Sequence, residues 1–220
     1  MNIVLLQYKI FPIFSTAMDV VPLVYPESDD TYLIIDSLIQ DVSPQQFDSE
    51  AGIVSVEIGP GGGSVSKSFV EHCSKLGLKV FHLAVDVNMH ACVATRAVCE
   101  NAERVECING EGLSFLRPGF EADLIFCNPP YAPSSPLNRA RDIRASYAGG
   151  ERGREMIDSI FPVVIQKLSG RGSFYLLLES RNDIPEVLRI AETQYNMKAR
   201  LVRERKIRGE HLFVYCFSRI

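Results

Sequence analysis

The tetrapeptide Asn128-Pro129-Pro130-Tyr131 directly follows an apolar run, 123–127, and combines a side-chain amide with two prolines. The Asn128 side-chain oxygen and the Pro129 carbonyl can accept the two N–H bonds of a planar NH2 group, and Tyr131 can lie against that plane. Proline suits this position because its φ is fixed and its carbonyl stays free to face a ligand. These four residues are candidate catalytic residues for chemistry at such a nitrogen.

The nitrogen of a glutamine amide, adenine N6 or cytosine N4 is a poor nucleophile, because its lone pair is delocalised into the conjugated system. An enzyme must orient it within about 3–3.5 Å of an electrophilic carbon. The tetrapeptide therefore predicts a methyltransferase acting on an amide or amino-heterocycle nitrogen. The alternative interpretation is an ordinary strand-ending turn, since Asn-Pro is a strong turn signal.

A strand, a glycine-rich loop and a helix start upstream predict a site for a nucleotide-like methyl donor. The expected strand 53–58 is followed by Gly59, Gly61 and Gly63, and a helix begins near Ser64. Glycines at such a turn let the backbone approach a ligand and adopt positive φ.

Three acidic residues follow or end the expected strands of this region. Glu57 precedes the glycines, where a carboxylate repels a pyrophosphate but suits a cationic sulfonium ligand carrying an ammonium group. Asp86 ends the strand 80–85 and is placed to accept the two hydroxyls of a ribose. Glu111, after the short strand 105–108, is a candidate acceptor for an adenine amino group, or alternatively a solvent-facing acid.

With these motifs the chain resembles the HemK-like class I methyltransferases, and among them the eukaryotic and archaeal enzymes that methylate the glutamine of the Gly-Gly-Gln motif in class I translation termination factors. The resemblance extends from about Tyr25 to the C-terminus. It implies S-adenosyl-L-methionine as cofactor, with Thr31 and Asn128 as further donor contacts beside Glu57, Gly59 and Asp86. The segments that carry it are 25–32, 57–63, 86–88, 128–131 and 147–155.

Two departures from the family pattern stand out. The family usually has Tyr-Glu-Pro where this chain has Tyr25-Pro26-Glu27, in the segment that closes over the donor. It also has Asp-Leu where this chain has Glu111-Gly112, at the adenine contact.

The resemblance also implies a partner. Enzymes of this branch work as a heterodimer with a small zinc-binding activator protein that covers an apolar surface. The edge of the short strand 105–108 is a candidate for strand addition by this protein, although apolar residues there are equally expected in a core. No metal is expected in this chain itself, because its four histidines show no ligand spacing.

Composition fits one intracellular domain. The chain has 220 residues, of which 46% are apolar, and its six cysteines form no Cys-x-x-Cys pair, so we expect reduced core thiols. The apolar start is too short and too interrupted to span a bilayer. We therefore expect a cytoplasmic protein, with a nuclear pool also allowed. The expected parts are an N-terminal extension (1–24), a donor-closing segment with a helix (25–52) and a Rossmann-like core (53–220).

Alternating patterns along the core predict an α/β fold, a seven-stranded, mostly parallel sheet with an antiparallel C-terminal strand at its edge. Asn128 then lies at the carboxyl end of the fourth strand beside the end of the first, where open α/β sheets bind ligands. The remaining expected elements are helices 31–39, 88–101, 151–168 and 183–194, a strand 172–178, and a hairpin of 198–206 and 210–217.

The acceptor nitrogen stays open between several classes of substrate. A glutamine of a termination factor is favoured, because the acidic chain, with net charge −4, has no segment for duplex recognition and nucleic acid is unlikely as substrate. The alternatives are DNA adenine, protein lysine, or a non-catalytic donor-binding scaffold.

Two groups of basic residues predict either a docking surface or a solvated face: Arg139, Arg141, Arg144, Arg152 and Arg154, and Lys198, Arg200, Arg203, Arg205, Lys206 and Arg208. The loop 132–150 is expected to select the substrate.

Overall fold

The computed structural model describes residues 23–47, 52–102, 104–134 and 149–220. Over these residues the strands form a single seven-stranded sheet in the order β3-β2-β1-β4-β5-β7-β6. All strands run in one direction except β7, which is antiparallel to both of its neighbours. The strands are β1 (Ile53–Ile58), β2 (Val80–Asp86), β3 (Val105–Asn109), β4 (Ala122–Cys127), β5 (Leu168–Glu179), β6 (Met197–Ile207) and β7 (Glu210–Arg219).

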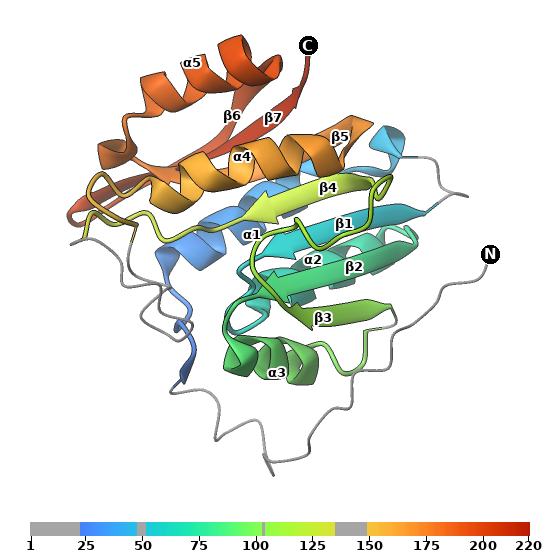
Figure 1. Ribbon diagram of the computed structural model, residues 1–220. Coiled ribbons are helices and arrows are strands. Elements are labelled where there is room, and N and C mark those ends of the chain that lie inside the picture. Colours follow the sequence, from blue (N-terminus) through green and yellow to red (C-terminus); the bar gives the residue numbers. More distant parts are fainter. Residues whose placement is uncertain (1–22, 48–51, 103, 135–148) are drawn as a thin grey trace.

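Helices cover both faces of the sheet, so each face has its own apolar core (Figure 1). On one face, α1 and α2 pack against alternate residues of β1, β4, β5 and β7, with α3 beside α2. On the other face, α4 and α5 cover the remaining alternate residues. The helices are α1 (Asp29–Asp41), α2 (Ser64–Lys75), α3 (Met89–Val98), α4 (Glu155–Lys167) and α5 (Ile184–Tyr195), with short 3-10 turns at Pro44–Gln46 and Ser180–Asn182.

The expected fold class is confirmed, and most helix bounds differ by a few residues for local reasons. Helix α1 begins at Asp29, two residues earlier than expected, because Ser28 is extended and forms a capping box with Thr31. Helix α4 begins at Glu155, not at 151, because Gly150 and Gly153 take φ values of +79° and +68° that helical backbone excludes.

One expectation about the sheet is wrong. The final strand β7 does not lie at the edge; it is inserted between β5 and β6, and β6 is the edge strand. The burial of the two strands explains this order. Most of β6 is exposed, whereas Leu212, Val214 and Phe217 of β7 are fully buried against both faces.

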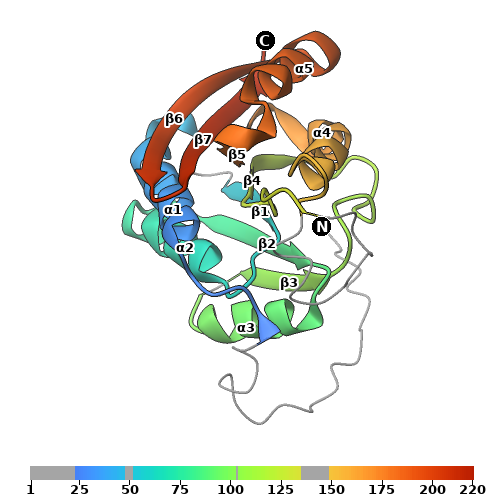
Figure 2. The same cartoon turned by 90° about the vertical axis from the view of Figure 1, so that its left-hand side faces the viewer.

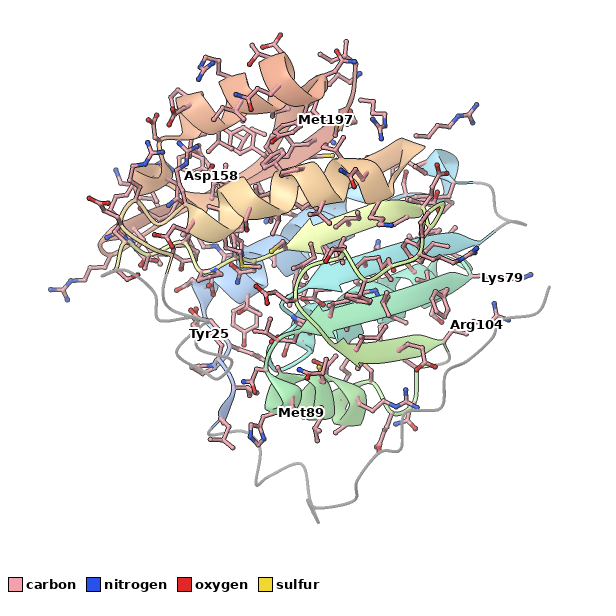
Figure 3. All side chains as sticks on the ribbon, in the orientation of Figure 1. Tyr25, Lys79, Met89, Arg104, Asp158 and Met197 are labelled. Carbon is pink, nitrogen blue, oxygen red and sulfur yellow. The ribbon has the colours of Figure 1, made fainter. Side chains whose placement is uncertain are left out.

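The parallel strands deliver their carboxyl ends to one end of the sheet. There β1 and β4 lie side by side, with Ile58 opposite Cys127, so the glycine loop and the Asn-Pro-Pro-Tyr motif emerge together. Figure 3 shows Tyr25 at this end, while Lys79 and Arg104 mark the opposite end of β2 and β3. In the turned view of Figure 2, the hairpin of β6 and β7 lies against α1.

Candidate active site

A crevice of about 790 Å³ opens at the carboxyl ends of β1, β2 and β4. It is in the size range of small-molecule and cofactor sites. Every residue predicted for the site lines it except Gly63: Thr31, Glu57, Gly59, Gly61, Asp86, Glu111, Asn128, Pro129, Pro130 and Tyr131.

The glycine loop forms one wall through backbone that bends away from the strand. Gly59 and Gly61 have φ values of +74° and +55°, and the Gly61 N–H donates to Asp86 Oδ2 over 3.3 Å. Gly63 serves packing, since a Cβ there would lie 2.7 Å from the Cα of Thr95 on α3. It lets α2 approach α3 closely, and the crevice wall continues with Ser64.

The carboxylate of Asp86 is held in place at the tip of β2. Its Oδ1 accepts a hydrogen bond from the Asn88 N–H over 2.8 Å, and Asn88 in turn caps α3 by accepting from the His90 N–H. Burial raises the pKa of Asp86, while the backbone donors Asn88 and Gly61 oppose that shift. The fixed acid fits the predicted role of binding two ribose hydroxyls.

Glu57 lies in a buried polar network that the sequence did not reveal. Its side chain is 2% exposed and accepts a hydrogen bond from Ser66 Oγ, which lies 2.9 Å from His82 Nε2. Burial raises the pKa of Glu57 to about 8 and lowers that of His82 to about 3. The 3.9 Å approach of these two side chains is therefore no ion pair, because the imidazole is neutral. Glu57 is a protonated acid that a nearby cation would ionise.

The side chain of Asn128 has one satisfied end and one unsatisfied end. Its Nδ2 donates to Asp30 Oδ2 over 3.1 Å. Its Oδ1 is buried and has no hydrogen-bond partner among the described residues. A buried acceptor left unpaired costs about 1–3 kcal/mol, so this oxygen is ready for an N–H donor supplied by a ligand.

The Tyr131 backbone is fixed by residues distant in sequence. Its carbonyl accepts a 2.9 Å hydrogen bond from Asn182 Nδ2, which also reaches the Gly153 carbonyl. A Cβ on Gly153 would lie 2.1 Å from the Tyr131 carbonyl oxygen. The tyrosine hydroxyl is within 3.4 Å of Asp30 Oδ2 and 3.3 Å of Glu210 Oε2 and donates to these acids. Asn182, Asp30 and Glu210 are site residues that motif spacing could not identify.

The segment before α1 lies across the glycine loop. Tyr25 approaches Gly61 and Gly62, and its hydroxyl donates to Asp30 Oδ2 over 3.2 Å. Glu27 accepts hydrogen bonds from Ser64 Oγ and from the Tyr32 hydroxyl. The Tyr25-Pro26-Glu27 order thus links the closing segment to the first residue of α2.

The electrostatic character of the crevice is acidic. Its described lining contains no Lys, Arg or His. The carboxyl groups belong to Glu27, Asp30, Glu57, Asp86, Glu111, Glu155 and Glu210. Such a lining favours a cationic ligand and repels phosphates.

Ion pairs within the chain account for many of the basic residues noted in the sequence, so these side chains already have acidic partners and are less available as a docking surface. On β6, arginines pair with acids of α1: Arg200 with Asp41, Arg203 with Asp36, and Arg205 with Asp29 and Asp36. In the segment before α4, Arg154 pairs with Asp158 and Glu186, and Arg152 with Glu186. Arg139, Arg141, Arg144 and most of the loop 132–150 lie outside the described residues, as does most of the extension 1–24.

Comparison with known proteins identifies the family. The chain is 32% identical over 177 residues to the human protein named methyltransferase HEMK2, and the match covers 78% of each chain. This chain belongs to the HEMK2 family of methyltransferases. The fission yeast protein named eRF1 methyltransferase catalytic subunit mtq2 is 27% identical over 181 residues, covering 77% of this chain and 78% of the relative. No protein-family model matches the chain.

Solved structures agree with the fold of a HEMK2-family enzyme. The Encephalitozoon cuniculi Mtq2–Trm112 complex superposes with a TM-score of 0.64 at 21% identity, over 90% of this chain and 99% of that chain. The ribosomal protein L11 methylase of Lactobacillus delbrueckii superposes with a TM-score of 0.59 at 13% identity, covering 88% and 81%. The expected methyltransferase fold and activity are confirmed, and the alternative of a non-catalytic donor-binding scaffold is not supported.

Two negative findings apply to the described part of this HEMK2-family chain. No helix there is long and apolar enough to cross a bilayer. No group of three or more His, Cys, Asp or Glu side chains there is arranged to hold a metal ion.

Proposed function

We propose that the chain is the catalytic subunit of an S-adenosylmethionine-dependent enzyme that methylates N5 of the glutamine in the Gly-Gly-Gln motif of a class I translation termination factor. The fission yeast relative is named as the eRF1 methyltransferase catalytic subunit, and the Encephalitozoon complex is described as responsible for methylating that termination factor. A termination factor acts on ribosomes, so we place the enzyme in the cytoplasm.

The crevice residues suit the donor. Asp86 binds the ribose hydroxyls, Gly59 and Gly61 let the backbone approach, and Glu57 faces the ammonium group. Glu111 accepts from the adenine amino group, and Thr31 contacts the donor from the first turn of α1. When bound, the donor supplies an electrophilic methyl group on a sulfonium. The acidic lining around it stabilises this cation.

The single observation that carries the proposal for the acceptor is the buried Oδ1 of Asn128, which has no hydrogen-bond partner in the described part of the chain. In the proposed complex it accepts one N–H of the glutamine amide, and the Pro129 carbonyl accepts the other. Both bonds draw charge toward the amide nitrogen and fix its direction. The methylated amide then loses its proton to solvent, so no general base is needed.

The charge of the crevice argues against DNA as the substrate. A flipped base arrives with its own phosphates, and these would meet the carboxylates of Glu27, Glu155 and Glu210 at the crevice. The described lining of the crevice offers no Lys, Arg or His to neutralise them. A glutamine side chain that follows two glycines brings no charge, and its glycine neighbours add little bulk.

The same acidic lining favours protein lysine as a second candidate acceptor. A lysine ammonium would be attracted to Asp30 and Glu210 beside Tyr131. It must lose a proton before attack, and a carboxylate is a weak base for that step. Glutamine therefore remains the principal proposal.

We propose further that a small zinc-binding activator completes the enzyme by pairing with β3. This strand pairs only with β2 among the described residues, so its other edge is open to strand addition. Phe81 of β2 and Phe115, after β3, are 39% and 44% exposed. The Encephalitozoon relative is described as a complex with Trm112, which supports a heterodimer.

Mass spectrometry of the product tests the proposed acceptor. The enzyme with its activator should add one methyl group to the Gly-Gly-Gln peptide of the factor, and fragmentation should place it on the glutamine side chain. A factor with Gln→Lys at this position tests the second candidate in the same experiment. Methyl groups found only on lysines would overturn the glutamine proposal.

A further inference from the structure

We propose that Asp30 is a positioning residue that fixes the orientation of the Asn128 side-chain amide, and that it thereby makes the site selective for acceptors that donate an N–H bond. The inference rests on the proposed function, because it concerns the same acceptor site. Asp30 lies in the segment 25–32 that carries the family resemblance, but the sequence assigned it no role of its own.

The direction of the Asn128 amide follows from donor and acceptor chemistry. Asp30 Oδ2 lies 3.1 Å from Asn128 Nδ2. An ionised carboxylate only accepts hydrogen bonds, so the NH2 end of the amide must face it. In the reversed orientation, Oδ1 of Asn128 would lie against the carboxylate, with two acceptors in contact and no proton between them. The oxygen is therefore directed away from Asp30.

Asp30 is itself held so that it cannot turn away. It is 2% exposed, and its Oδ1 accepts from the Thr31 N–H over 2.6 Å and from Ser28 Oγ. Its Oδ2 also receives the hydroxyls of Tyr25 and Tyr131 over 3.2 and 3.4 Å. The first turn of α1 adds N–H groups and a favourable dipole for this charge. Hydrogen bonds from five residues, Asn128 among them, thus hold the carboxylate in place.

The contact joins two parts of the site that are 98 residues apart in sequence. Asp30 belongs to the segment that crosses the glycine loop, and Asn128 belongs to the acceptor motif. Fixing Asn128 Oδ1 as an acceptor selects amides and amines that present N–H. It rejects an acceptor that presents a carbonyl or ether oxygen at the same point, because two acceptors would then meet.

The substitution Asp30→Asn tests the inference with almost no change of shape. An asparagine can either accept from Asn128 Nδ2 or donate to Asn128 Oδ1, so both orientations of Asn128 become allowed. With the activator present, kcat for methylation of the factor should fall at least about tenfold. The dissociation constant of S-adenosylhomocysteine, measured by calorimetry, should change far less.

The matched control is Asp29→Asn, the same chemical change one residue earlier in α1. Asp29 is exposed, lies outside the crevice lining and pairs with Arg205. This variant should keep the kcat and donor affinity of the wild type. A comparable loss of kcat in both variants would show that helix charge, and not the Asn128 contact, is responsible, and would overturn the inference.

A spectroscopic measurement separates this inference from the proposed substrate. The side-chain NH2 resonances of Asn128, identified by their loss in Asn128→Ala, should show one proton shifted downfield by the carboxylate. The shift should disappear in Asp30→Asn and persist in Asp29→Asn, whether or not any acceptor is methylated. Unchanged resonances in Asp30→Asn would contradict the positioning role. If the shift is lost in Asp30→Asn but the wild-type enzyme does not methylate the factor, only the proposed function is contradicted.

Discussion

At the scale of single residues, Glu57 makes donor binding depend on pH. Burial raises its pKa to about 8, so at pH 7 most molecules carry a proton there. A cationic donor that pairs with Glu57 must displace this proton, and close to one proton, about 0.9, should be released per donor bound at pH 7. Calorimetry in buffers of different ionisation enthalpy measures this number.

The expected release falls toward zero by about pH 9, where Glu57 is already ionised. The Glu57→Gln variant carries no such proton, so it should release far less at pH 7 and bind the donor more weakly. Equal proton release by the wild type and this variant would rule out Glu57 as the group that titrates.

Glu57 also makes the stability of the free enzyme depend on pH. The pKa of Glu57 in the folded chain is above its ordinary value of 4.5, so the folded state holds a proton that the unfolded state gives up between the two values. The free energy of unfolding of the free enzyme should therefore be largest below about pH 4.5, as far as Glu57 is concerned, and fall as the pH rises to about 8.

Urea unfolding of wild type and Glu57→Gln measures that contribution. Glutamine keeps the shape without the titration, so the difference in stability should shift in favour of the variant as the pH rises from 5 to 8. A difference that is independent of pH would mean that the folded and unfolded chains bind this proton equally.

Sequence reasoning found Asp86 and Asn128 because each ends a strand, and strand ends are visible in an apolar pattern. It missed Asp30 and Asn182, whose roles consist of contacts to Asn128 and Tyr131 across 98 and 51 residues. No spacing rule encodes such a contact. His82 was missed for another reason, since a lone histidine in a strand gives no sign that Ser66 will meet it.

At the scale of elements, the turn before α4 supports the acceptor motif and gives a matched pair of glycine substitutions. Gly153→Ala and Gly119→Ala both place a side chain at positive φ, +68° and +77°. The positive φ alone should cost each variant about 1 kcal/mol of stability, and the contact at Gly153 adds to that cost. A new Cβ at Gly153 would meet the Tyr131 carbonyl, whereas at Gly119 it would have none of its non-adjacent described residues within 4 Å.

Gly153→Ala should therefore also lower kcat, by at least about tenfold, because it displaces the Tyr131 backbone. Gly119→Ala should retain kcat at a temperature where both variants are folded. Thermal melting and methyl transfer on the same samples provide the comparison. Equal kcat values for the two variants would show that the motif does not need this support.

The order of β6 and β7 shows where pattern reasoning about elements ends. Alternation identified both strands and their turn, but both orders of a hairpin at a sheet edge satisfy the same alternation. The order depends on which strand is buried on both faces. Leu212 on one face of β7 and Phe217 on the other are fully buried, whereas most of β6 is exposed. The start of α4 is similar, because the glycines mark a turn without giving its exact end.

At the scale of the whole molecule, the open edge of β3 predicts where the activator binds. Phe81→Glu should weaken association with the activator at least about tenfold, because it places a charge in an apolar contact. Leu201→Glu, at a residue that is 43% exposed on β6, is the control and should leave association unchanged. Surface plasmon resonance with immobilised activator measures both, and equal affinities would place the interface elsewhere.

Net charge predicted less about the whole molecule than its distribution does. The sequence shows a modest excess of acids, −4, and clustered arginines. Only folding shows that arginines of β6 neutralise α1 while seven carboxyl groups gather at the crevice. That separation distinguishes a site for a cationic donor from a surface for nucleic acid.

The most direct test of the account is transfer of labelled methyl groups from S-adenosylmethionine by the enzyme and its activator to three acceptors: the termination factor, the same factor with Gln→Ala in Gly-Gly-Gln, and duplex DNA. Label should appear on the first acceptor alone. Asn128→Ala should abolish that label while donor binding persists. Label on the DNA, or equal label on the Gln→Ala factor, would contradict glutamine as the acceptor.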